Sequence, residues 1–191
     1  MSQNYIENYL DNAASVIQNS KSLMSDIEST LNICKKALEE RNTFFFCGNG
    51  GSASDSQHLA AELIGRYQHN RRAIPALSLT VDTSAITAIA NDFGFENVFS
   101  RQLEGLGKPG DILFALSTSG KSENVINAMR TAKSLGILVI GLTGEDGSNF
   151  ADFCDSLIQV PSKVTCHIQE AHIAIGQLIC GYIEDLVLDE S

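Results

Sequence analysis

The chain has 191 residues, of which 43% are hydrophobic and 19% charged, as is typical of a globular rather than a disordered protein. Its 13 Lys and Arg against 23 Asp and Glu give a net charge of −10, so we expect no nucleic-acid partner. The notable lack of an apolar run near the ~20 residues that cross a bilayer, and of a signal-peptide pattern at the start, predicts no membrane partner and a cytoplasmic location.

Residues 1–41 are predicted to be helical. Apolar side chains recur at spacings of four, three and four between Ile27 and Leu38, which is one stripe of an α-helix. The pair Asn19-Ser20 is expected to interrupt this segment, because both residue types favour caps and turns over helix interiors.

Beyond residue 42, short apolar runs alternate with helical patterns. Strands are predicted at 43–47, 74–79, 111–116, 137–142 and 156–160. Helices are predicted at 52–68, 83–91, 95–106, 121–135 and 164–187. This alternation predicts an α/β fold, a three-layer, doubly wound, five-stranded parallel sheet with N-terminal helices and a long C-terminal helix.

The whole chain, 1–191, is predicted to form a single domain. Its parts would be an N-terminal helical segment (1–41), an α/β core (42–163) and a C-terminal helix (164–187). The terminal helices carry more apolar surface than one sheet can cover, so we expect residues 1–41 to serve in oligomerisation.

Two smaller features concern cysteine and arginine. The five cysteines are odd in number and show no CxxC spacing; four lie in apolar stretches, which predicts buried free thiols in a reducing compartment. Arg66, Arg71 and Arg72 form the one basic cluster, and we interpret it as a solvated helix end.

Two loops share one pattern, an apolar strand followed by Gly and Ser residues and then a helix. In the first loop Asn49, Gly50 and Gly51 lead to Ser52, which suits a helix N-cap. Such loops direct backbone N–H groups and a helix dipole at an anion, although an isolated loop of this kind is more often a plain turn.

The second loop is richer in hydroxyl groups. Ser117, Thr118, Ser119 and Ser122 surround Gly120, and capping explains only one or two of them. Since loops after parallel strands meet at the carboxyl edge of the sheet, the two loops together predict a phosphate site.

Two polar pairs lie outside these loops. His58 and Glu62 are four residues apart on one helix face, which fits a metal pair, a base with its orienting partner, or an ordinary surface pair. Asn91 and Asp92 end an apolar helix, where a C-terminal cap and a contact to sugar hydroxyls are equally open interpretations.

The last helix carries polar residues among apolar neighbours, namely Gln169, Glu170, His172 and Gln177. Gln169 and Gln177 are eight residues apart, a rise of about 12 Å along a helix. If both served one small site, we would expect a distortion near Gly176 or a contribution from a second subunit.

Five segments in order carry a resemblance: GNGGSASDSQHLAAEL, LTVDTSAITAIANDFGFENVFSRQ, STSGKSENV, GLTGEDG and VPSKVTCHIQEAHIAIGQLIC. Together they resemble the phosphoheptose (sedoheptulose-7-phosphate) isomerase family of the sugar isomerase (SIS) domain superfamily, in one register over about 40–185. The resemblance implies a flavodoxin-like fold and cytoplasmic homotetramers with interfacial active sites. It also implies conversion of sedoheptulose 7-phosphate to D-glycero-D-manno-heptose 7-phosphate, and one zinc ion per subunit.

The resemblance also implies roles for single residues. Substrate contacts are implied at Asn49, Gly50, Gly51, Ser52, Glu62, Asn91, Asp92, Ser117, Thr118, Ser119, Ser122 and Gln169. Metal ligands are implied at His58, Glu62, Gln169 and Gln177. Glu62 would be the base of an enediol or enediolate mechanism, and the catalytic positions would be Glu62 and Gln177.

Position 177 departs from the family pattern, which has a zinc-binding, acid–base histidine there. A glutamine amide transfers no proton near neutral pH, so turnover and zinc binding would be weakened. Three explanations remain: an engineered His→Gln variant, a natural relative without catalysis, or a rewired enzyme that uses His172. The intact remainder of the site favours the first.

The main functional hypothesis is therefore an isomerase at the first step of bacterial ADP- or GDP-heptose biosynthesis, which leads to lipopolysaccharide, capsule or surface-layer glycans. The alternative is a non-catalytic SIS-domain binding protein of the replication-initiator-associating type. Those relatives tend to lack the glutamate at position 62, which this chain retains. A sugar-phosphate sensor is disfavoured by the lack of a DNA-binding module.

Overall fold

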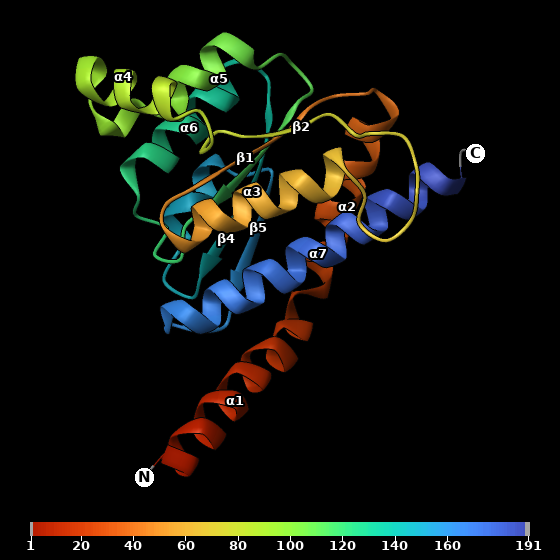
Figure 1. Ribbon diagram of the computed structural model, residues 1–191, viewed down its shortest axis with the longest axis vertical. Helices are drawn as coiled ribbons and strands as arrows, with labels where there is room; N and C mark the ends of the chain where they lie inside the picture. The colour runs from red at the N-terminus through yellow and green to blue at the C-terminus, as the bar shows by residue number, and fades with distance from the viewer. Residues whose placement is uncertain (1, 190–191) are drawn as a thin grey trace.

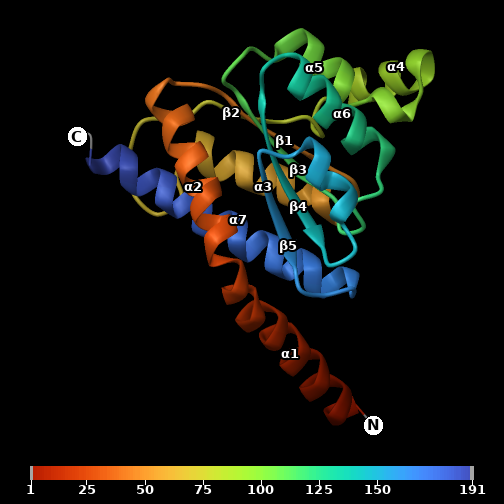
Figure 2. The same ribbon diagram turned by 180° about the vertical axis from the view of Figure 1, so that it is seen from behind.

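A computed structural model describes residues 2–189 of the chain. At the N-terminus α1 (Ser2–Asn19), a short 3₁₀ turn η1 (Ser20–Leu23) and α2 (Met24–Glu39) follow one another. The turn confirms the expected interruption, and its Ser20 hydroxyl donates to the Val16 carbonyl one turn earlier. In Figures 1 and 2, α1 extends away from the body of the molecule.

The strands are β1 (Phe44–Gly48), β2 (Ala76–Ser78), β3 (Ile112–Leu116), β4 (Leu138–Gly144) and β5 (Ser156–Val160). The longer helices of this part are α3 (Gly51–Ile64), α4 (Thr83–Phe93), α5 (Ser100–Leu106), α6 (Glu123–Ser134) and α7 (Thr165–Asp189), with 3₁₀ turns η2 (Phe95–Asn97) and η3 (Ser148–Phe153). The prediction was wrong for two helices and one strand: the helix expected at 95–106 is a 3₁₀ turn followed by α5, the helix expected at 52–68 ends at Ile64, and the strand expected at 74–79 is shorter.

All neighbouring strands pair in parallel, in the order β2-β1-β3-β4-β5. This is the flavodoxin-like order, which confirms the predicted doubly wound sheet. The order reverses between β1 and β3, where Gly48 pairs with Leu116. Ligands of such sheets bind beyond the carboxyl ends of the strands at this reversal.

Alternate side chains of the strands enter two separate cores. Phe44 and Phe46 join the core that α2, α3 and α7 cover, whereas Phe45 and Cys47 face the core under α5 and α6. Figures 1 and 2 show these helix layers on opposite faces of the sheet. Because β1 and β3 are buried on both faces, their sequences read as unbroken apolar runs.

Helix α7 is long and apolar enough to cross a membrane by length and composition alone, with a mean hydropathy of 1.3. Half of that window is buried inside the protein, and its buried face includes Ile168, Ile175 and Ile179. These contacts identify α7 as a core helix of the domain.

The cysteines are free thiols, as predicted. Cys34, Cys47 and Cys180 are buried, Cys154 is half-buried and Cys166 is exposed, so the expectation of burial was too broad. Burial raises the pKa of the Cys154 and Cys180 thiols to about 12, which keeps both protonated.

Candidate active site

The first Gly/Ser loop leaves β1 and turns at once into α3. Gly50 is the N-cap residue with a φ of 56°, a left-handed conformation that glycine adopts without strain. Ser52 lies inside the first turn of α3 and is buried, so the prediction that Ser52 caps the helix was wrong. The short turn places the N-terminus of α3 directly above the end of β1.

The second loop joins β3 to α6 and holds its hydroxyl groups through local contacts. Ser117 Oγ and Ser122 Oγ lie 3.1 Å apart, and Ser119 Oγ accepts a hydrogen bond of 3.2 Å from the Lys121 backbone N–H. Gly120 has a φ of 62°, and a Cβ built there would lie 2.6 Å from Gly147 Cα. The loop is therefore held tightly against the turn that follows β4.

The two loops enclose one hollow of about 290 Å³ at the carboxyl edge of the sheet, at the β1/β3 reversal. It is lined by Asn49, Gly50, Gly51, Ser52, Leu116, Ser117, Thr118, Ser119, Ser122, Thr165 and Gln169. None of these side chains carries a charge. Hydroxyls, amides and the N-termini of α3 and α6 are groups that bind phosphate without a cation.

Gln169 reaches this hollow from the first turns of α7. A Cβ built on Gly51 would lie 2.5 Å from Gln169 Nε2, so the glutamine side chain packs directly on the first loop. Thr165, the first residue of α7, also lines the hollow and was missed by the sequence analysis. Thr165 could have been placed there from the sequence, because the loop after β5 ends at the same edge of the parallel sheet.

His58 and Glu62 lie on α3 but do not line this hollow. His58 Nε2 is 2.9 Å from Glu62 Oε1, and the side chains are 48% and 19% exposed. One turn earlier, Asp55 Oδ2 is buried and has no hydrogen-bond partner within the described chain. Burial raises the pKa of Asp55 to about 6, although nearby His58 opposes the shift. This face of α3 thus carries the imidazole and carboxylate groups that proton transfer needs.

The geometry fits zinc only in part. His58 and Glu62 supply an imidazole nitrogen and a carboxylate oxygen that lie 2.9 Å apart. Both groups are zinc ligands in proteins. Among residues 2–189, however, no three His, Cys, Asp or Glu side chains gather as a metal group. The other two predicted ligands, Gln169 and Gln177, offer only neutral amide oxygens, which are weaker donors.

Gln169 and Gln177 lie in different hollows of one chain. Gln177 lines a second hollow of about 400 Å³ that also includes Tyr67, His69 and Tyr182. Helix α7 has no distortion near Gly176, so of the two expected ways for both glutamines to serve one site the contribution from a second subunit stays a prediction. Gly176 is in contact with Leu59, since a Cβ there would be 2.6 Å from Leu59 Cδ1.

His172 is fully buried, and its Nε2 donates a hydrogen bond of 3.2 Å to the Thr143 carbonyl. Burial lowers the pKa of His172 to about 4, so the ring is neutral near pH 7. His172 lines neither the hollow between the two Gly/Ser loops nor the hollow that includes Gln177. This burial disfavours His172 as the acid–base group, and the three explanations of Gln177 stay predictions.

Asn91 and Asp92 lie exposed on the last turn of α4, away from the hollow. Asn91 Nδ2 donates to Asp92 Oδ1 at 2.7 Å, and the C-cap residue is Gly94. The interpretation of this pair as a helix cap is therefore wrong. A contact to sugar hydroxyls stays a prediction.

The basic cluster was also interpreted wrongly at Arg71. Its side chain is buried and donates hydrogen bonds to the carbonyls of Glu62, Leu63 and Gly65, at the C-terminal end of α3. Arg71 Nε lies 3.3 Å from Glu184 Oε1 on α7. The Arg71 side chain thus caps the C-terminal end of α3, the helix that carries Glu62.

Comparison with known proteins finds similarity over nearly the whole chain. A family model described as SIS domain matches residues 8–144. A phosphoheptose isomerase from Akkermansia muciniphila is 51% identical over 180 residues, covering 94% of this chain and 95% of that protein. One from Nitratiruptor sp. is 55% identical over 153 residues, covering 80% and 82%.

Among solved structures, the phosphoheptose isomerase from Neisseria gonorrhoeae has a TM-score of 0.91 and 38% identity, covering 97% of this chain and all of that one. Sequence, strand order and the placement of both loops therefore lead to the same conclusion. The chain belongs to the SIS domain superfamily and, within it, to the phosphoheptose isomerase family.

Proposed function

We propose that this protein is an aldose–ketose isomerase that converts sedoheptulose 7-phosphate to D-glycero-D-manno-heptose 7-phosphate. The observation that carries the proposal is near full-length similarity to proteins named phosphoheptose isomerase, at 42–55% identity. No observation favours the non-catalytic binding protein of the replication-initiator-associating type. Glu62, which that alternative does not need, is present and paired with His58.

The proposed phosphate site is the neutral hollow between the two Gly/Ser loops. Hydroxyl groups of Ser117, Thr118, Ser119 and Ser122 face the same space as the N-terminus of α3. A phosphate dianion brings its own charge, so neutral donors and helix dipoles stabilise it without a lysine or arginine in the lining.

The proposed chemistry is proton transfer between adjacent carbons. Glu62 removes the proton from the carbon beside the carbonyl, which forms an enediolate, and returns it to the neighbouring carbon. A second group moves a proton between the two oxygens, so that a carbonyl and a hydroxyl exchange places. Gln177 stands where the family has a histidine for this step, and its amide does not transfer protons near pH 7.

Zinc is the proposed cofactor, one ion per subunit, with His58 and Glu62 as its principal ligands. Bound there, zinc would polarise the substrate oxygens as a Lewis acid. Gln169 and Gln177 add amide oxygens at most, so we expect weaker binding than with a histidine at position 177. Metal analysis of the purified chain and of Gln177→His tests this expectation.

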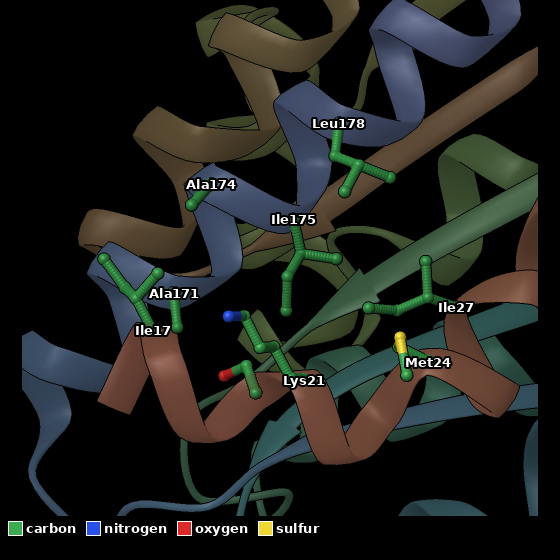
Figure 3. Close-up of a pocket in the computed structure, with 9 residues that line it drawn as sticks. Ile17, Lys21, Met24, Ile27, Ala171, Ala174, Ile175 and Leu178 are labelled. Carbon is green, nitrogen blue, oxygen red and sulfur yellow. The ribbon is translucent and has the colours of Figure 1, made fainter. Parts of the chain in front are cut away.

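The proposed assembly is a homotetramer with active sites at subunit interfaces. An apolar hollow of about 300 Å³ lies between the η1 region and α7, lined by Ile17, Met24, Ile27, Ile175 and Leu178 among others (Figure 3). On α1, Tyr5, Ile6 and Leu10 are more than half exposed. We assign a second copy of this chain as the partner for these surfaces.

Interfacial sites would also reunite the candidate residues. One chain leaves Asn91 and Asp92 on α4, Gln177 in its own hollow, and Glu62 outside the phosphate hollow. A neighbouring subunit supplying part of this set would complete one site. Light scattering of the purified protein, and of an Ile6→Asp, Leu10→Asp double variant that charges the exposed face of α1, tests the assembly.

The proposed place in metabolism is the first step of bacterial ADP- or GDP-heptose biosynthesis, in the cytoplasm, for lipopolysaccharide, capsule or surface-layer glycans. The direct test is heptose 7-phosphate formation by the unaltered chain and by Gln177→His. We expect the histidine variant to be faster by about 10²-fold or more, the usual contribution of an acid–base group.

Conversion by neither form would contradict the isomerase. Equal conversion by both would support the isomerase and contradict the role given to position 177. A pull-down with a replication initiator, alongside calorimetry with the sugar phosphate, tests the binding-protein alternative on the same samples.

A further inference from the structure

The two loops of the phosphate hollow are joined by one pair of side chains. Asn49 Nδ2 donates to Asn124 Oδ1, and Asn124 Nδ2 donates to Asn49 Oδ1, both at 2.8 Å. The residues are 75 positions apart in the chain. Asn124 lies in the first turn of α6 and is only 4% exposed.

We propose that Asn124 is a positioning residue, which fixes the first loop against the second and so sets the geometry of the phosphate hollow. Asn124 does not line the hollow itself, whereas its partner Asn49 does. The role rests on the proposed function, because it concerns the affinity of that same site for a sugar phosphate.

The amide pair supplies what the loop backbones lack. β1 and β3 are adjacent, so the loops leave the sheet side by side, but each contains a glycine with positive φ, Gly50 or Gly120. Backbone N–H donors bind an anion well only when they are held within a fraction of an ångström of the required positions. A cyclic pair of hydrogen bonds fixes both the distance and the relative orientation of two planar amides.

The pair also depends on both residues being amides. Each asparagine contributes one donor and one acceptor, so the bonds are complementary and carry no charge. Aspartate at 124 would have the same shape but would oppose its carboxylate to Asn49 Oδ1, and it would add negative charge beside the phosphate. Alanine would leave the half-buried amide of Asn49 without these two hydrogen bonds.

The test compares Asn124→Ala, Asn49→Ala and the double variant, with Asn127→Ala as the matched control. Asn127 lies one turn further along α6, and its Nδ2 donates to the Glu96 carbonyl, away from the loops. The affinity for inorganic phosphate is measured by calorimetry, KM and kcat with sedoheptulose 7-phosphate in the Gln177→His background, and folding by thermal unfolding.

We expect Asn124→Ala to weaken phosphate affinity and raise KM by about tenfold, the effect of losing a hydrogen-bond pair worth about 1.4 kcal/mol. We expect kcat to change less than KM, the double variant to be no worse than the more affected single variant, and Asn127→Ala to stay within about twofold of the parent.

Independent effects of the two single variants, multiplying in the double variant, would overturn the inference. So would an unchanged phosphate affinity in a folded Asn124→Ala protein. These results are distinguishable from failure of the proposed function, in which inorganic phosphate binds and responds to Asn124→Ala but no form converts the sugar.

Discussion

The carboxyl edge of the sheet and the far end of α3 hold their polar groups in opposite ways. At the edge, neutral hydroxyls and amides line an open hollow. At the far end, the carboxylate of Glu184 is buried, accepts hydrogen bonds of 2.7–2.8 Å from the backbone N–H groups of Tyr67, Gln68 and His69, and pairs with Arg71.

The difference follows from what each region must do. When a ligand leaves, the donors of its site need other hydrogen-bond partners. The neutral hydroxyls of an open hollow can bind water instead. A permanent contact has no such requirement, so the buried carboxylate of Glu184, held by three backbone N–H groups and Arg71, can fix the loop after α3 to α7. Glu62 lies between the two regions, in the last turn of α3, where its backbone carbonyl accepts a hydrogen bond from Arg71.

The largest expected effect concerns the charge at Glu62. Glu62→Gln, in the Gln177→His background, should lower kcat by about 10³-fold, because the amide does not accept the proton. Affinity for inorganic phosphate should be unchanged, since Glu62 does not line the hollow. Steady-state kinetics and calorimetry check the two expectations, with exposed Glu104→Gln as the control. Retention of most of the activity would remove Glu62 from the mechanism.

The next effect concerns the buried carboxylate. Glu184→Gln should reduce the free energy of unfolding by about 3 kcal/mol, because it leaves the buried Arg71 guanidinium without its counter-charge. Glu145→Gln, at an exposed pair with Lys163, should change it by less than about 1 kcal/mol. Urea unfolding of both variants measures the contrast, and equal effects would show that burial of the ion pair is unimportant.

The same carboxylate predicts a pH dependence. Burial alone would raise the pKa of Glu184, but the three backbone N–H donors and Arg71 outweigh it and lower the pKa below its ordinary value. A lowered pKa in the folded state adds stability above the unfolded value of about 4.3, and this stability is lost as the pH falls through the folded pKa. The stability difference between the parent and Glu184→Gln should therefore be full at pH 7 and narrow in acid.

A smaller effect should separate the two loops. Gly120→Ala should reduce the free energy of unfolding by about 2 kcal/mol, because of the positive φ and the collision with the Gly147 backbone. Gly50→Ala should cost about 1 kcal/mol, since its φ is also positive but a Cβ there meets no atom within 4 Å. Thermal unfolding compares the two, and the reverse order would contradict the tight contact described for the second loop.

The smallest effect concerns salt. Since the hollow has no charged lining, affinity for inorganic phosphate should fall by less than about twofold between low and physiological ionic strength. A steep dependence would indicate that nearby Lys121 or Lys163 binds the anion.

Much of this architecture could be predicted from sequence because burial on both faces gives strands an unmistakable apolar run. Strands β1 and β3, buried on both faces, were predicted to within one residue at each end. The edge strand β2 was predicted too long, because Ile74 and Leu79 are buried apolar residues that lie just outside the paired segment. The 3₁₀ turn before α5 was missed because it shares the apolar spacing of the helix that follows.

The site was predictable where local chemistry repeats, as in the two Gly/Ser loops. It was not predictable where a contact joins distant segments. Nothing around Asn124 marks it as the partner of Asn49, and nothing around Arg71 predicts a buried side chain rather than a solvated one. The burial of His172 could not be predicted either, because it results from the packing of α7 on β4.

Helix α7 runs without a break from Gln169, at the phosphate hollow, to Glu184, at the buried ion pair. The separation is about 22 Å along a stiff axis. Because a continuous helix is stiff along its axis, a displacement of one end along that axis moves the other end by the same distance. A mutation that loosens the loop after α3 should thus displace the Gln169 amide at the hollow where we propose that the phosphate binds, many residues from the altered position.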